Sequence, residues 1–280
     1  MKIAALALGA FIALQPAPYD AVLAKLDAYL ADYEPKLSEL IADETMFQEI
    51  KGEFSRIRTE DTALLGRVGD RQKRLQSEVA FIALPKDSGW LGFRHVKVVN
   101  RDALDDDQSL TTSLSVSGVD GARTLLEASA AHNLGLPRTT NLPNLPLEFL
   151  HRRNRHRLVA RLDGYERVRG VTAVRVVFHE KVTPTLIRHP DGGDMPSTIR
   201  AWIDPVNGRL LKAVVMTFKH PSAPKSENSV EVDFEHEEKL GLLVPKQMKE
   251  TFPADPGTGT SSATYSNYRR FTTSARIVPQ

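Results

Sequence analysis

Apolar and polar residues alternate through most of the last third of the chain, from Pro196 to Ile277. Alternation places successive side chains on opposite faces of a strand, so each segment is predicted to be a β-strand with one buried and one solvated face. The predicted strands span residues 199–203, 209–218, 229–235, 242–252 and 263–271. Between the first two, Asp204-Pro-Val-Asn-Gly208 has the residues of a tight hairpin turn. An antiparallel sheet with one solvated face is therefore expected here.

A stripe of apolar residues runs through residues 19–47, at steps of three and four residues as far as Leu40. This spacing predicts an amphipathic helix. The stripe consists of Leu23, Leu26, Leu30, Tyr33, Leu37, Leu40 and Phe47. Pro35 interrupts it, so the helix is expected to kink there or to restart with Pro35 in a first turn. A coiled-coil seam would need more heptads, so packing within this chain is favoured.

The middle of the chain is expected to mix strands with two short helices. Asp120 and Gly135 suit the two ends of the first helix, and Pro146 suits the first turn of the second. The predicted elements are a strand at 45–50, a loop or ragged hairpin at 51–72, a hairpin of 73–84 with 90–100, helices at 120–134 and 141–150, strands at 157–162 and 171–178, and a hairpin loop at 253–262. This order predicts one α+β domain over residues 19–280.

The N-terminus has the pattern of a secretory signal. Lys2 is followed by the apolar run Ile3–Leu14 and by Gln15-Pro-Ala-Pro18. The run is too short to span a membrane comfortably, so we expect a signal peptide over residues 1–18 and no transmembrane span in the mature chain. A buried N-terminal helix is the alternative. The predicted location is the periplasm or the exterior.

Composition excludes several classes of function. The chain has no cysteine, which excludes disulfides, thiolate catalysis and Cys-based metal sites. A formal net charge of +2 gives no overall field for nucleic acid, and no nucleic-acid partner is expected.

Catalytic and metal-binding motifs give no strong signal. Neither a Gly-x-Ser-x-Gly elbow nor a His-Glu-x-x-His pair occurs in the chain, and Gly257-Thr-Gly-Thr-Ser261 lacks the ending of a P-loop. Asp233, Glu235 and Glu237 would share one strand face, which could bind a cation but more often faces water. Asp105-Asp-Asp107 lacks the spacing of a calcium loop. No metal, cofactor or catalytic residue is predicted.

Basic residues concentrate in His151-Arg-Arg-Asn-Arg-His-Arg157. Arginine forks suit phosphate and carboxylate groups, so Arg152, Arg153, Arg155 and Arg157 are candidates for contact with an anionic headgroup. The simpler interpretation is a solvated turn between a helix and a strand.

Two resemblances are carried by specific stretches. Ile203-Asp-Pro-Val-Asn-Gly-Arg-Leu-Leu211, with the strands after it, resembles a hairpin of the LolA/LolB-like lipoprotein carriers. Six further stretches resemble an uncharacterised family of exported, acidobacterial-type bacterial proteins. They are residues 29–33, 89–93, 138–143, 184–188, 244–250 and 263–271. The carrier resemblance implies a strongly curved antiparallel sheet, an unclosed half-barrel, wrapped over the N-terminal helix. It also implies that the concave sheet and a helical lid hold lipoprotein acyl chains.

We therefore expect a non-catalytic periplasmic protein that binds an apolar ligand, such as a lipid or the acyl chains of a lipoprotein. The candidate cavity residues are Phe81, Trp90, Phe93, Phe149, Leu150, Trp202 and Phe234, although for each of them a place in the plain core is the favoured interpretation. One alternative is an envelope protein–protein interaction module with a solid core and no ligand. A hydrolase with an unrecognised site is a further alternative.

Overall fold

A computed structural model describes residues 19–52, 54–59, 62–67, 69–83, 90–104, 126–189, 191–223, 225–254 and 257–270. Side chains are described throughout these ranges except at 54–59, 62–67, 82–83 and 90–91. The predicted signal peptide, Asp105-Asp-Asp107 and the start of the predicted 120–134 helix lie outside the described residues.

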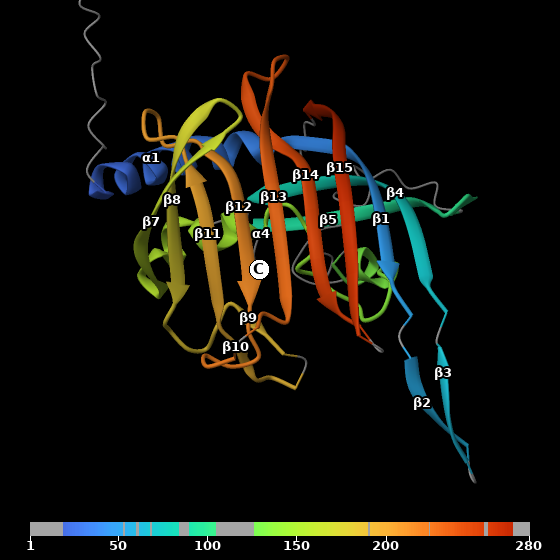
Figure 1. The fold of residues 1–280 in the computed structure, drawn as a ribbon. Helices are drawn as coiled ribbons and strands as arrows, with labels where there is room; N and C mark the ends of the chain where they lie inside the picture. Colours follow the sequence, from blue (N-terminus) through green and yellow to red (C-terminus); the bar gives the residue numbers. More distant parts are fainter. Residues whose placement is uncertain are drawn as a thin grey trace, which may run out of the picture.

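An antiparallel sheet of 11 strands dominates the fold, and its two outermost strands do not meet (Figure 1). Every neighbouring pair in it is antiparallel. In spatial order the strands are β6 (Asp102–Ala103), β5 (Trp90–Val99), β4 (Arg71–Ala83), β1 (Leu40–Ile50), β15 (Thr258–Arg270), β14 (Leu242–Pro253), β13 (Asn228–Glu237), β12 (Leu210–Thr217), β11 (Ser197–Ile203), β8 (Val171–Glu180) and β7 (Leu158–Val168). The open, antiparallel α+β architecture predicted from the sequence is confirmed.

Two small hairpins stand apart from this sheet. One pairs β2 (Phe54–Thr59) with β3 (Thr62–Arg67), which is the ragged-hairpin alternative for residues 51–72. The other pairs β9 (Ile187–Arg188) with β10 (Asp194–Met195) and was not predicted. Their positions are visible in Figure 1.

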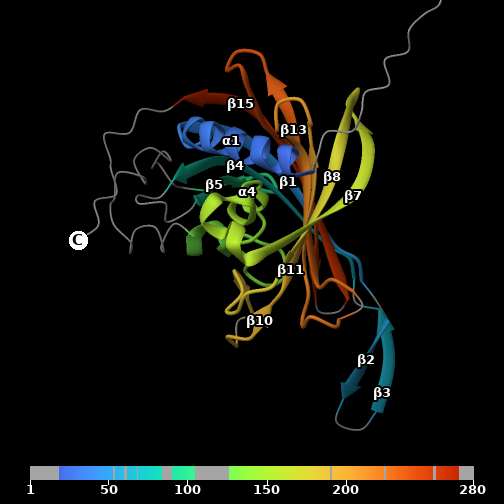
Figure 2. The same ribbon diagram turned by 90° about the vertical axis from the view of Figure 1, so that its left-hand side faces the viewer.

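The helices lie on one side of the sheet, which curls around them (Figure 2). They are α1 (Tyr19–Leu37), a helical stretch at 126–131, α4 (Leu145–Leu150) and the 3₁₀ helix η2 (Arg152–Arg157). We call this side of the sheet the inner face. Ile199, Ala201 and Ile203 of β11 point to the inner face and are fully buried. The N-terminal helix thus lies across the concave side, as predicted.

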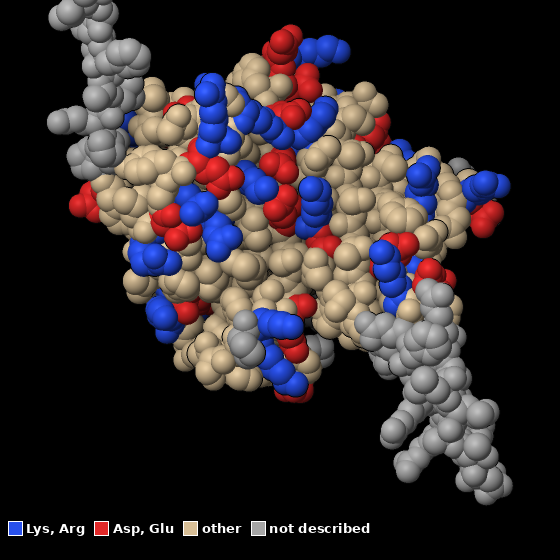
Figure 3. All heavy atoms as spheres, viewed as in Figure 1, with Lys and Arg blue, Asp and Glu red and all other residues tan. Residues whose placement is uncertain are grey.

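The opposite, outer face carries alternating charges. Arg200, Lys212 and Glu231 project from β11, β12 and β13, and Lys212 and Glu231 form an ion pair at 3.0 Å. Figure 3 shows basic and acidic side chains interspersed over this face. The solvated face inferred from the alternating sequence is therefore the outer one.

Helix α1 ends earlier than the apolar stripe suggested. Its last residue is Leu37, and Leu40 already belongs to β1, so the expected strand at 45–50 begins five residues sooner. The Ser38 amide donates to Glu34 O at 3.1 Å and the Ser38 hydroxyl to Pro35 O at 2.7 Å, which closes the last turn. Leu40 lies three residues after Leu37, which suits the apolar stripe of a helix. It also begins the alternating pattern of the following strand. The prediction that Leu40 belongs to the helix was therefore wrong.

The predicted turn at Asp204–Gly208 joins β11 to β12 and touches α1. The Gly208 amide donates to Asp204 O at 2.8 Å, and Lys25 Nζ donates to Pro205 O at 2.8 Å. Gly208 has φ of +76°, and a Cβ added there would lie 2.2 Å from the backbone oxygen of Lys25. Only glycine allows this close approach between the turn and the helix.

The other expectations hold with shifted boundaries. Strands β4 and β5 pair as the predicted hairpin, with Ala83 opposite Trp90. The expected loop at 253–262 is too long, because β15 already begins at Thr258. Gly259 of β15 faces the ring of Phe252, and a Cβ added at Gly259 would lie 2.3 Å from a carbon of that ring. The glycine therefore leaves room for the Phe252 ring against the strand.

Candidate ligand-binding site

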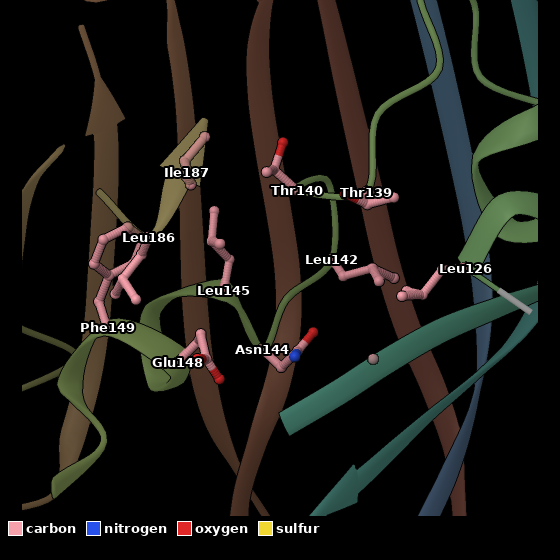
Figure 4. Close-up of a pocket in the computed structure, with 11 residues that line it drawn as sticks. Leu126, Thr139, Thr140, Leu142, Asn144, Leu145, Glu148, Phe149, Leu186 and Ile187 are labelled. Carbon is pink, nitrogen blue, oxygen red and sulfur yellow. The ribbon is translucent and has the colours of Figure 1, made fainter. Parts of the chain in front are cut away.

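A cavity of about 210 Å³ lies between the inner face of the sheet and the segment that carries α4 (Figure 4). Its wall comes from β5, the helical stretch at 126–131, the loop before α4, α4 itself and β9. The lining residues are Gly92, Leu126, Thr139, Thr140, Leu142, Asn144, Leu145, Glu148, Phe149, Leu186 and Ile187. Six of them are Leu, Ile or Phe, and none of these eleven described residues is Ser, His, Lys or Arg.

The wall formed by Leu186 and Ile187 is held in place by polar contacts. The Leu186 amide donates to Glu180 Oε1 at 2.8 Å, and the Thr185 hydroxyl donates to Ile187 O at 2.6 Å. The Thr185 amide donates in turn to Asp194 Oδ1 on β10 at 2.8 Å. Burial raises the pKa of the Glu180 carboxyl, and the Leu186 amide and Arg157 counteract that effect only in part. The hairpin is thus tied to the end of β8.

Asn144 is one of the polar residues of the wall, together with Thr139, Thr140 and Glu148. It occupies the N-cap position of α4, yet its side chain makes no capping hydrogen bond, and Asn144 is 6% exposed. Its Oδ1 is buried without a partner and packs against Gly92, where an added Cβ would lie 2.2 Å from that oxygen. Asparagine at an N-cap normally accepts from the first turn of its helix. Here the amide turns away from the helix and toward β5 and the cavity (Figure 4).

Behind the cavity, a buried ion pair fixes the loop to the sheet. Arg94 on β5 and Glu44 on β1 form two hydrogen bonds, and both side chains are fully buried. Arg94 Nη2 also donates to Asn141 O at 3.0 Å. Burial alone would lower the pKa of Arg94, but the adjacent Glu44 carboxylate raises it, so the guanidinium stays charged. The loop carrying Thr139–Asn144 is therefore attached to the sheet through a charged group.

Amide side chains extend this network. Asn141 Nδ2 donates to Asn133 Oδ1 at 2.7 Å, and the Leu134 amide donates to Gln48 Oε1 on β1 at 2.5 Å. Gln48 is fully buried, and Asn133 and Asn141 are buried with it. The segment is therefore held down by hydrogen bonds at this end and by apolar packing at α4.

A second ion pair anchors the same segment to β14. Arg138 Nε donates to Glu250 Oε1 at 2.8 Å, and its guanidinium lies 3.6 Å from the ring centroid of Phe252. Arg138 Nη1 also donates to Leu134 O at 2.9 Å. Glu250 accepts a further bond from the Ser261 hydroxyl at 2.9 Å. Arg138 thus joins the turn at 134–136 to the sheet.

The predicted cavity residues separate into distinct places. Phe149 lines the cavity, whereas Phe81, Leu150 and Phe234 are buried in the core on the inner side. The side chain of Trp90 lies outside the described residues.

Phe93 and Trp202 face the other way. Phe93 lies opposite Ala80, between the inward-facing Gly92 and Arg94, so it points to the outer side of the sheet. Trp202 lies opposite Lys212 and Arg175, and its Nε1 donates to Glu166 at 2.8 Å. The sequence-based prediction named both as candidate cavity residues, but strand register decides which face a side chain is on.

The arginine cluster is mostly occupied by internal ion pairs. Arg153 binds Glu148, Arg155 lies 3.1 Å from Asp27 of α1, and Arg157 lies 3.5 Å from Glu180. Arg155 also lies over the Phe178 ring, 4.9 Å from its centroid. Arg152 is exposed, and it forms no ion pair within the described part of the chain. Three of the four arginines therefore join η2 to α4, α1 and β8.

Of the described lining residues, the sequence-based prediction named Phe149 and missed the other ten. Gly92, Thr139, Thr140 and Asn144 belong to no chemical motif, although Gly92, Thr139 and Thr140 fall within stretches used for the family resemblance. A usable signal was the sequence Asn144-Leu-Pro146, because Pro146 removes one of the amides that an N-cap side chain would bind.

The described residues were compared with the patterns of metal sites and membrane-spanning helices. Among the described residues, no three His, Asp or Glu side chains are grouped so as to hold a metal ion. No helix in the described ranges is long and apolar enough to span a bilayer.

Comparison with known proteins gives only distant likenesses. No family model matches the chain, and no curated protein matches it. A DUF1329 family protein from Desulfovibrio piger is 12% identical, with a TM-score of 0.45 over 90% of this chain and 93% of that chain. A domain assigned to outer membrane lipoprotein sorting in Vibrio parahaemolyticus is 10% identical, with a TM-score of 0.42 over 89% and 92%. A LolA superfamily protein from Nitrosomonas europaea is 11% identical, with a TM-score of 0.35 over 91% and 94%. At these values the likenesses define neither a family nor a function for this chain.

Proposed function

We propose that this protein is a non-catalytic binding protein for an apolar ligand, such as a lipid or an acyl chain, held in the cavity beneath α4. The observation that carries the proposal is the lining itself, in which six Leu, Ile and Phe side chains from four separate segments converge. Concave, mainly apolar sites with few polar groups are the usual form of small-molecule sites. Among the described lining residues no Ser, Cys or His occurs, so they contain no pair of the Ser–His type.

The size of the cavity limits what fits. Typical ligand pockets measure roughly 300–1,000 Å³, whereas an apolar cavity of about 150 Å³ holds a benzene-sized guest. The present cavity, at about 210 Å³, lies between these. It suits the end of one chain or a small molecule, and several acyl chains together would need the α4 segment to move outward.

Export to the periplasm or exterior is part of the proposal. It is supported by the sequence pattern Lys2, Ile3–Leu14 and Pro16 to Pro18. On this proposal residues 1–18 are a signal peptide and residues 19–280 are one half-barrel domain of the lipoprotein-carrier type.

A cavity-filling variant tests the proposal. Ile187→Trp should fill the cavity and abolish uptake of a fluorescent fatty-acid probe. Val206→Trp is the matched control, because Val206 is 72% exposed on the turn that faces α1. Native mass spectrometry of protein purified from an envelope fraction should show a bound lipid in the control and not in Ile187→Trp. Equal probe uptake by both variants, or none by the wild type, would contradict the proposal.

A second candidate function is that of a protein-interaction module, favoured by the edge strand β7. β7 ends the sheet and leaves Val159, Leu162 and Tyr165 exposed at 56%, 40% and 46%. Exposed apolar side chains on an edge strand are typical of a site that receives another chain. Against it, the irregularity between Leu162 and Gly164 and the charge of Arg161 are features that protect edges from pairing.

Site-specific photocrosslinking separates the two candidates. A crosslinker at Leu162 should give a defined protein adduct in envelope preparations if β7 is an interface, and one at Val206 should not. An adduct pattern at Leu162 no different from that at Val206 would contradict the interaction module. It would leave the ligand-binding proposal untouched.

A further inference from the structure

We infer that the ligand of the cavity is a neutral molecule or chain end that presents one hydrogen-bond acceptor oxygen, such as an ester or amide carbonyl, to the side chain of Asn144. This inference rests on the proposed function and specifies its ligand class. Its starting point is Asn144, which is 6% exposed and lines the cavity.

The amide of Asn144 makes no side-chain hydrogen bond to any described residue. Oδ1 is sealed against Gly92 without a partner, and α4 begins without a side-chain cap. Because Oδ1 is enclosed, the NH₂ group is the part of the amide left to meet a ligand. A buried amide without a partner is unfavourable, and a ligand oxygen accepting from Nδ2 would relieve part of that cost.

Gly92 permits the close approach of the Asn144 amide to β5. The missing side chain lets the amide oxygen lie against the backbone of β5, where a Cβ would be 2.2 Å away. The amide is therefore fixed from one side by the strand. A fixed donor at the wall of an apolar cavity orients a ligand without having to be ordered when the ligand binds.

The charge of the lining restricts the ligand further. Glu148 is the charged residue of the wall, and its carboxylate binds Arg153 and the Asn154 side-chain amide. Because no Lys or Arg is among the described lining residues, a carboxylate or phosphate beside them would be desolvated without a counter-charge. The group that reaches Asn144 is therefore uncharged, and by volume the enclosed part holds roughly eight non-hydrogen atoms, scaled from a benzene-sized guest in about 150 Å³.

Three small probes test the inference: methyl pentanoate, n-octane and the hexanoate ion, which are matched in their number of non-hydrogen atoms. Dissociation constants are measured at neutral pH by NMR titration of wild type, Asn144→Leu and Asn144→Ala. In the wild type, methyl pentanoate should shift the side-chain NH₂ signal of Asn144 and bind at least tenfold more tightly than hexanoate. Both substitutions should weaken the ester about 3- to 10-fold, as expected for one lost hydrogen bond, and should not weaken octane.

The possible outcomes distinguish a failure of the proposed function from a failure of the role inferred for Asn144. If no probe binds the wild type, the proposed function and this inference both fail. If the ester and octane bind the wild type and both variants in parallel, the cavity binds apolar ligands but the role of Asn144 is overturned. If hexanoate binds as tightly as the ester, the requirement for a neutral ligand is overturned. The Ala variant keeps the test valid should Leu disturb the fold.

Discussion

Arg94 on β5 and Glu44 on β1 form a bidentate ion pair although β4 lies between their strands. Both side chains have no exposed surface, and Arg94 Nη2 lies 2.9 Å from Glu44 Oε1. The pair spans the inner face of β4 and supports Asn141 in the loop that borders the cavity. A buried ion pair therefore supports the loop that borders this mainly apolar cavity.

Removing one member of this pair should be costly. Arg94→Met is expected to lower the free energy of unfolding by about 3–5 kcal/mol, because it leaves the Glu44 carboxylate buried without a partner. The double variant Glu44→Leu/Arg94→Met should recover much of that loss. The measurement is urea-induced unfolding followed by circular dichroism.

Arg269→Met is the matched control for this prediction. Arg269 pairs with Asp43 and Glu78 on the outer face, where its side chain is 41% exposed. An exposed pair contributes about 0–1 kcal/mol. A similar loss for Arg94→Met and Arg269→Met would contradict the importance of burial for the Arg94–Glu44 pair.

Gly208→Ala should destabilise the contact between α1 and the sheet. The substitution adds a Cβ at positive φ and within 2.2 Å of a backbone oxygen that cannot swing away. We expect a loss of at least about 2 kcal/mol in the free energy of unfolding. Gly241→Ala should cost only about 1 kcal/mol, since Gly241 has φ of +63° but no atom within 4 Å of an added Cβ. Thermal unfolding of the two variants side by side tests the difference, and equal shifts would refute it.

Glu180 should make stability depend on pH. Burial raises its pKa in the folded protein above the ordinary value of 4.5, so folding favours the protonated form. Its contribution to stability is therefore fully present below about pH 4.5 and is lost as the pH rises through the folded pKa. Relative to Glu180→Gln, the wild type should lose stability as the pH rises from about 4.5 through the folded pKa of Glu180.

The measurement for Glu180 is the difference in unfolding free energy between wild type and Glu180→Gln at several pH values. Taking the difference removes the contributions of other titrating groups, such as Asp43. A difference that does not change with pH would show that the folded and unfolded pKa values are equal.

The affinity for neutral esters should rise with chain length and then level off. Each methylene buried in the cavity is expected to contribute about 0.8 kcal/mol, or about fourfold in affinity. Beyond the length that fills about 210 Å³, added methylenes remain outside the cavity. Dissociation constants for methyl esters from propanoate to dodecanoate should therefore reach a plateau. A continuous increase to dodecanoate would show that the cavity expands when the α4 segment moves.

Features of the fold that arise from interactions between residues close in the sequence were predictable, whereas those that arise between distant residues were not. The strands of the last third and the turn at Asp204–Gly208 were predicted well, because alternation and turn chemistry are local. Leu40 was misassigned, since its spacing suits both a helix end and a strand start. The α4 helix followed from Pro146 in its first turn.

The sequence by itself determined the fold class and a solvated sheet face, because both follow from residue periodicity. Only the tertiary structure decided which aromatic residues face inward, since that depends on register across strands: it placed Phe149 at the cavity and Trp202 on the outer face. It also decided the roles of polar residues with no motif. Glu44 meets Arg94 across an intervening strand, and Asn144 meets Gly92 from a separate segment. Such pairs are joined by the folding of distant segments, which leaves no local pattern in the sequence.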